Sequence, residues 1–151
     1  MIKQFFSTNT QSWSLLVSRL ALGAVILPHG MQKVLGAFGG NGFSATLGFM
    51  HGQMGMPVIL VLLVMAAEFL GSIGVILGAG TRFMAFSITL TFFGAMFLGG
   101  HIYNGFFMNW FGAQKGEGIE YFILVLGLEI SLLIGGSGKF SVDNWISKKL
   151  K

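Results

Sequence analysis

The chain has 151 residues, of which 54% are hydrophobic and 9% are charged, and its formal net charge is +4. Soluble domains carry about 25% charged residues, so this chain has too little polar material for a water-exposed surface, and a one-domain integral membrane protein is indicated. The absence of cysteine excludes disulfides, thiolate nucleophiles, iron–sulfur clusters and cysteine-bound zinc. The positive charges do not form a stripe with base-stacking aromatics, which argues against nucleic-acid binding.

The first 35 residues predict an interfacial segment over residues 1–14 and a membrane helix over residues 15–35. No small-residue cleavage site follows the apolar stretch, so we expect the first span to be retained. Arg19 and Lys33 lie on one face of this helix, with His29 close to it. Because Pro28 cannot donate a backbone hydrogen bond, we expect the helix to bend and open at Pro28-His29-Gly30.

Residues 36–77 predict a glycine-rich turn, a short interfacial helix over residues 43–54 and a second span over residues 57–77. About 20 apolar residues cross a bilayer core, and this span carries a single charge, Glu68. Such a group costs on the order of 2.5–3.5 kcal/mol at the centre of a membrane helix. Small residues form a seam beside it and predict the packed face: Ala67, Gly71, Gly74 and Gly78.

The second half of the chain predicts a third helix over residues 83–103, an aromatic loop and a fourth helix over residues 119–134. Glu120 and Glu129 are nine residues apart on the fourth helix, so they face opposite ways and cannot form one paired acid site. Residues 136–151 form a basic tail. The predicted fold is an all-α bundle of four membrane-spanning helices within residues 15–135.

Basic residues are unevenly distributed between the two sides of such a bundle. With four spans, the side with both termini holds Lys3, Arg19, Arg82, Lys139, Lys148, Lys149 and Lys151, and the other side holds Lys33 and Lys115. Because positive charge favours the cytoplasmic side, we expect both termini in the cytoplasm and the aromatic loops outside.

Two groups of polar residues lie at membrane depth. In the inner group we expect an ion pair between Arg19 and Glu68, with Arg82 snorkelling at the cytoplasmic turn; alternatively, Glu68 is a proton-carrying or ligand-binding carboxylate. The outer group could hydrogen-bond a quinone or only hold helix ends together. Its ligand-binding candidates are His29, Lys33, His101, Asn104, Trp110, Glu120 and Tyr121. His29, His101 and Glu120 suit a metal by residue type but lack a ligand-spacing motif, so no metal is predicted.

The order and spacing of short motifs resembles the DoxX family over roughly residues 16–143. The motifs are Arg19, His29-Gly30-Met31-Gln32-Lys33, Phe38-Gly39-Gly40, Glu68-Phe69-Leu70-Gly71-Ser72, Thr81-Arg82, His101, Asn104-Gly105-Phe106-Phe107 and Glu120-Tyr121. The resemblance implies a four-helix protein of the bacterial inner membrane. Some relatives are membrane subunits of thiosulfate:quinone oxidoreductase, others occur beside oxidative-stress enzymes, and distant ones act as cargo receptors or assembly factors.

The family's shared polar positions would map to Arg19, His29, Lys33, Glu68, Arg82, His101 and Glu120, whereas Glu129 has no counterpart among them. These observations favour a redox-associated, quinone-interacting membrane subunit that works with a partner redox protein or as a homo-oligomer. No phosphate-binding, dinucleotide or acyl-transfer motif is present, so no nucleotide cofactor is predicted. The alternatives are a non-catalytic scaffold or assembly factor, and a small-molecule or proton pathway through Glu68.

Overall fold

The computed structural model describes residue 6 and residues 8–149. Residues 1–5, 7 and 150–151 lie outside this part, and so do the expectations for Lys3, for Lys151 and for the start of the interfacial segment. The described residues form helices and no strands, which confirms the all-α prediction. The elements are α2 (Trp13–Leu35), α3 (Gly42–Gly48), a π-helical turn (Phe49–Gln53), α4 (Val58–Ala66), a second π-helical segment (Ala67–Gly71), α5 (Ser72–Leu77), α6 (Thr81–Phe97), a 3₁₀ turn (His101–Asn104), α7 (Ile119–Gly135) and α8 (Val142–Lys149).

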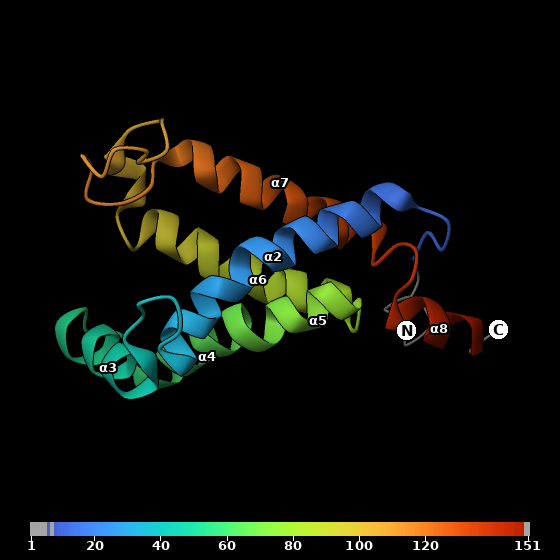
Figure 1. The fold of residues 1–151 in the computed structure, drawn as a ribbon, viewed down its shortest axis with the longest axis horizontal. Coiled ribbons are helices and arrows are strands. Elements are labelled where there is room, and N and C mark those ends of the chain that lie inside the picture. Colours follow the sequence, from blue (N-terminus) through green and yellow to red (C-terminus); the bar gives the residue numbers. More distant parts are fainter. Residues whose placement is uncertain (1–5, 7, 150–151) are drawn as a thin grey trace.

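Two of these helices are long and apolar enough to cross a membrane: Trp13–Leu35 and the continuous helix Val58–Leu77, while α6 is shorter and apolar. They run alongside α6 and α7 in an elongated bundle, with the start of α2 and the helix α8 at the same end (Figure 1). The outer surfaces of all four carry large exposed apolar side chains, as expected for contact with lipid tails. They include Val17, Leu20, Ile59, Leu63, Leu70, Phe83, Phe86, Leu90, Ile123, Leu124 and Ile130.

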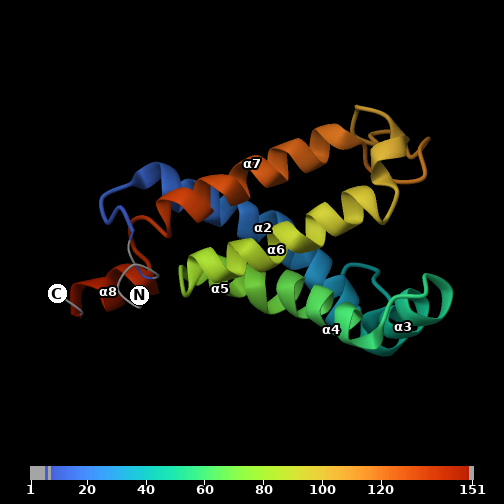
Figure 2. The ribbon, with the colours of Figure 1, turned by 180° about the vertical axis from the view of Figure 1, so that it is seen from behind.

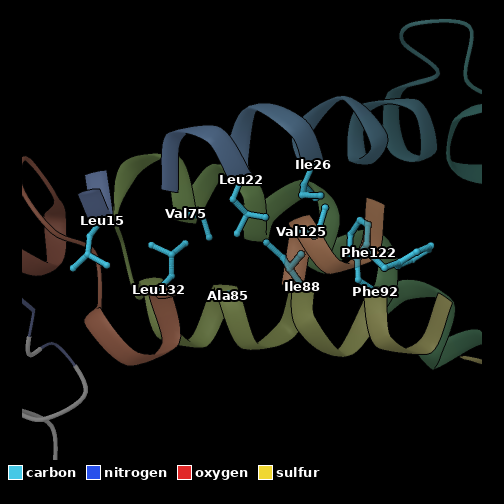
Figure 3. Close-up of a cluster of buried hydrophobic side chains, with 10 residues drawn as sticks. All are labelled: Leu15, Leu22, Ile26, Val75, Ala85, Ile88, Phe92, Phe122, Val125 and Leu132. Atoms are coloured by element: carbon cyan, nitrogen blue, oxygen red, sulfur yellow. The ribbon is translucent and has the colours of Figure 1, made fainter. Parts of the chain in front are cut away.

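One continuous hydrophobic core holds the four helices together. Its buried side chains come from α2, α5, α6 and α7 and point toward a common interior: Leu15, Leu22, Ile26, Val75, Ala85, Ile88, Phe92, Phe122, Val125 and Leu132 (Figure 3). The small-residue seam is buried as predicted, and Gly71 and Gly74 lie against Ile88 and Met84 of α6. Close backbone approach at these glycines therefore brings the second helix onto α6.

The helix ends differ from the predictions where backbone geometry intervenes. The helix that begins at Thr81 ends at Phe97 rather than near residue 103, because Gly99 and Gly100 follow and Gly100 has a φ of +75°. The helix of α2 is continuous through Pro28, so the expected opening there is wrong. Its start is capped by Ser12, whose Oγ accepts from Leu15 N at 3.2 Å.

The segment expected to be a basic tail contains a docked helix. Asp143 of α8 accepts from the backbone N–H groups of Gly80 and Thr81 at 2.7 and 2.9 Å, and its own N–H donates to Gly78 O at 2.9 Å. The carboxylate thus satisfies donors at the start of α6, where the helix dipole favours negative charge. These bonds hold α8 at the end of the bundle that carries both termini (Figure 2).

The crossing of α2 over the second helix depends on Gly30. A Cβ atom at this position would lie 2.6 Å from Cα and N of Phe69. We therefore expect Gly30→Ala to lower the free energy of unfolding by about 2 kcal/mol, as overpacking does. The matched control is Gly127→Ala on α7, where nothing lies within 4 Å of the added carbon, and helix propensity predicts about 1 kcal/mol of stabilisation. Unfolding in detergent with increasing denaturant checks both; equal effects of the two changes would contradict this crossing.

Candidate functional site

Side chains from the four main helices and from the loop between α6 and α7 line a partly open cavity of about 170 Å³ near the C-terminal end of α2. Polar side chains reach it from α2, the π-helical segment, the 3₁₀ turn and α7, and aromatic rings of α6 and α7 complete the wall. Its lining residues are His29, Lys33, Glu68, Thr91, Phe92, Ala95, His101, Glu117, Tyr121 and Phe122. Residues from both polar groups seen in the sequence therefore meet in one place.

An ion pair forms one side of the cavity. Lys33 Nζ lies 2.5 Å from Glu68 Oε2; the Lys33 side chain is 28% exposed and the Glu68 side chain 7%. The expected pairing of Glu68 with Arg19 is therefore wrong. Arg19 instead donates to backbone carbonyls near the opposite end of the bundle, those of Ile76, Lys139 and Phe140.

Local backbone geometry explains why Glu68 meets Lys33. Glu68 lies in the π-helical segment Ala67–Gly71, where the carbonyl oxygens of Glu68 and Phe69 accept from Ser72 Oγ at 2.5 and 2.9 Å. Gly30 of α2 packs directly on this segment, and Lys33 follows three residues later on a neighbouring part of the helix surface. Short π-helical segments of this kind are frequent at functional sites, and this one lies where the Glu68 carboxylate meets Lys33 of α2.

The opposite side of the cavity is built from the loop before α7. His101 Nδ1 lies 3.2 Å from Glu117 O, and Asn104 Nδ2 donates to the same carbonyl at 3.3 Å. Asn104 Nδ2 also lies 3.4 Å from His101 Nδ1. In the tautomer in which Nδ1 carries the proton and donates to Glu117 O, Nε2 is an acceptor. The His101 ring also packs on Phe122, with 5.2 Å between ring centroids. Backbone and ring contacts thus fix the orientation of this imidazole.

Tyr121 supplies a hydroxyl that its own surroundings do not satisfy. The phenol packs against Phe92 and Phe122, with centroids 6.0 and 5.5 Å away. Its Oη is buried and has no hydrogen-bond partner among the described residues. Buried polar groups are normally paired, and the Tyr121 side chain lines the cavity, so this hydroxyl is a candidate hydrogen-bond donor to a bound molecule.

Three other candidates from the sequence lie outside the cavity wall. Glu120 Oε2 accepts from Met108 N at 3.0 Å and so fixes the loop before α7. Asn104 holds the same loop through Glu117 O, and Trp110 is 77% exposed. Arg82 Nη2 donates to Ile134 O at 2.8 Å, at the end of α7. No group of three or more histidine and acidic side chains suited to a metal ion occurs in the described ranges.

Sequence reasoning assigned Glu68 to a different group from His29 and did not select Thr91, Phe92 or Phe122 as lining residues. No sequence motif marks Thr91 as a lining residue, and the π-helical segment at Glu68 has no sequence signal of its own. Glu129 is fully buried within the bundle.

Comparison with known proteins identifies the family of the chain. No curated protein and no solved structure matches the chain. The family model described as DoxX matches residues 14–101, which is more than half of the chain and includes His29, Lys33, Glu68 and His101. Glu117 and Tyr121 lie beyond the matched region. With its helices long and apolar enough to span a bilayer, the chain is a membrane protein that belongs to the DoxX family.

Proposed function

We propose that this protein is a quinone-binding membrane subunit, and that the cavity between α2, α6 and α7 holds the quinone ring. The observation that carries the proposal is the unpaired hydroxyl of Tyr121 beside an aromatic-walled cavity that also contains Lys33 and His101. The cavity of about 170 Å³ matches one ring in size, since a cavity of about 150 Å³ accommodates benzene. The isoprenoid tail would pass out between the helices into the lipid.

The side chains around the cavity offer both kinds of hydrogen bond that such a ring needs. Lys33 Nζ and Tyr121 Oη are donors for the two carbonyl oxygens, and His101 Nε2 is an acceptor that can hold a proton from a hydroxyl. The ion pair with Glu68 holds the Lys33 ammonium in place. A quinone accepts two electrons and two protons when reduced. The electrons would come from a partner redox protein, because the sequence has no cysteine and no nucleotide motif.

We propose further that α2, the helix Val58–Leu77, α6 and α7 each cross the membrane. The exposed apolar side chains around all four support this arrangement. Basic residues at the end with both termini support a cytoplasmic location for that end in a bacterial plasma membrane: Arg19, Arg82, Lys139, Lys148 and Lys149. The cavity would then lie toward the outer leaflet.

Tyr121→Phe tests the quinone site with the smallest possible change, because it removes one oxygen and keeps the ring. We expect the affinity of the purified protein for a short-chain ubiquinone or menadione to fall about tenfold, the value of one hydrogen bond of roughly 1.4 kcal/mol. Equilibrium titration in detergent measures the change. Ala95→Phe, which places a ring in the cavity, is expected to abolish binding altogether.

The matched control is Tyr103→Phe, which removes the same oxygen from a side chain that is 88% exposed and does not line the cavity. Its affinity is expected to equal that of the parent. If the parent binds neither quinone, or if Tyr121→Phe and Ala95→Phe bind as the parent does, the proposed function fails and the non-catalytic scaffold becomes the better interpretation.

A further inference from the structure

A second cavity lies at the opposite end of the bundle, beside α8. Its volume is about 250 Å³, and its wall includes two lysines, two polar residues that precede α2, and an aromatic ring: Lys139, Lys148, Thr10, Gln11 and Trp145. Neither the family resemblance nor the quinone site uses any of these residues. The cavity is far from Tyr121 and His101 in the bundle, because α2 separates the two ends along its 23-residue length.

Hydrogen bonds between the two ends of the described chain build this cavity. Gly138 N donates to Thr8 Oγ1 at 2.7 Å, and Lys139 N donates to Ser12 O at 3.2 Å. Lys139 O accepts in turn from the buried guanidinium of Arg19 at 3.1 Å. The backbone of Lys139 is therefore fixed from both sides, so the cavity is a built feature of the fold.

The lysines of this region carry positive charge without a nearby anion. Within residues 8–149, neither Lys139 nor Lys148 forms an ion pair. The adjacent acid, Asp143, is already engaged by the N–H groups of Gly80 and Thr81. Lys139 Nζ lies 4.3 Å from the centroid of the Trp13 ring, a cation–π contact that helps to fix the ammonium. The chemistry of the wall therefore suits an anion.

The position of the cavity relative to the apolar helices identifies the source of that anion. Thr10 and Gln11 immediately precede α2, whose apolar span begins at Trp13. Phe140 and Trp145 of the cavity wall are 68 and 59% exposed, and Trp13, which packs edge-on against Phe140, is 58% exposed. Exposed aromatic rings of this kind mark the boundary between hydrocarbon and headgroups. The lysines would thus lie at the depth of the lipid phosphates.

We propose that this cavity binds the phosphate diester headgroup of an anionic phospholipid. Lys139 and Lys148 would contact the phosphate, and the rings of Trp13 and Trp145 would lie against the upper acyl chain. The site is independent of the quinone proposal, because no residue lines both cavities. Loss of quinone binding would therefore leave it intact.

Quenching of tryptophan fluorescence by brominated lipids tests the site in the full-length protein. The Trp110→Phe variant serves as parent, because it leaves Trp13 and Trp145 as the only tryptophans. In vesicles, we expect brominated phosphatidylglycerol to associate about tenfold more strongly than brominated phosphatidylcholine, and Lys139→Gln/Lys148→Gln to reduce this preference to about twofold or less. The matched control, Lys115→Gln, removes one lysine from the loop at the other end and should keep the full preference.

Three results would overturn the proposal. The first is equal quenching of the parent by the two lipids, and the second is a preference that survives the double substitution in protein with unchanged helix content. The third is relief of the quenching by soluble glycerol phosphate, which we expect not to compete with the lipid. If it does relieve it, the cavity binds free phosphate compounds rather than a lipid.

Discussion

Lys33→Met is expected to lower the free energy of unfolding by about 3 kcal/mol. The substitution keeps an apolar stem of similar length but leaves the Glu68 carboxylate, whose side chain is 7% exposed, without its cation. Removing one partner of a buried ion pair typically costs about 3–5 kcal/mol, and the 28% exposure of Lys33 places the expectation at the lower end. Reversible unfolding in mixed micelles measures this loss. Quinone binding should weaken in the same variant, because a donor in the cavity disappears.

The double substitution Lys33→Met/Glu68→Met separates the ion pair from the packing. With both charges removed, no buried group is left unpaired, and well-packed apolar replacements of buried pairs are often neutral or stabilising. We therefore expect the double variant to be at least as stable as the parent while its quinone affinity stays low. Lys115→Met on the exposed loop is the matched control and should change stability by less than about 0.5 kcal/mol. If the double variant is less stable than Lys33→Met, the stability that Lys33 contributes does not come from its ion pair with Glu68.

Arg19→Met is expected to have the largest effect on stability, about 4 kcal/mol. The Arg19 side chain is 2% exposed, and its guanidinium joins the end of α5 at Ile76 to the segment before α8 at Lys139 and Phe140. Hydrogen bonds from a charged donor contribute about 1.5–3 kcal/mol each, and the substitution leaves several carbonyl groups without their donor. Thermal unfolding followed by circular dichroism would measure the loss.

Arg19→Lys is the informative companion variant. A planar guanidinium reaches acceptors on two separate segments at once, whereas an ammonium is a compact donor on a flexible stem. We expect lysine to recover less than half of the stability lost in Arg19→Met. Arg82→Met is the comparison on α6: the Arg82 side chain is partly exposed and donates to Ile134 O, so a loss of about 1 kcal/mol is expected. Full recovery with lysine would mean that charge alone, and not the shape of the donor, holds these segments together.

Much of the fold could be predicted from local signals. The apolar segments are long enough to be read directly as helices, and the observed α2 and α7 begin and end within two residues of the predicted bounds. The seam of Ala67, Gly71 and Gly74 marked the packed face correctly. The end of α6 was missed, because the hydropathy pattern continues past Phe97 while the positive φ at Gly100 stops the helix. The helical state of residues 142–149 was missed, although Ser141 Oγ caps its start by accepting from Asn144 N at 3.1 Å. The contacts that dock this helix, through Asp143, come from a turn that is distant in the sequence.

The sequence alone determined that this chain is an all-helical membrane protein with DoxX motifs and with too many ionisable groups at membrane depth to leave unpaired. Only the tertiary structure decided which of these groups meet. Glu68 pairs with Lys33 rather than Arg19 because a π-helical segment rotates its carboxylate toward the crossing at Gly30, while Arg19 lies nearer the other end and binds backbone carbonyls. Helical periodicity gives the face on which a residue of a regular helix lies. It cannot give the partner of Glu68, because the π-helical segment changes the face of this residue and Gly30, in another helix, sets the point of contact.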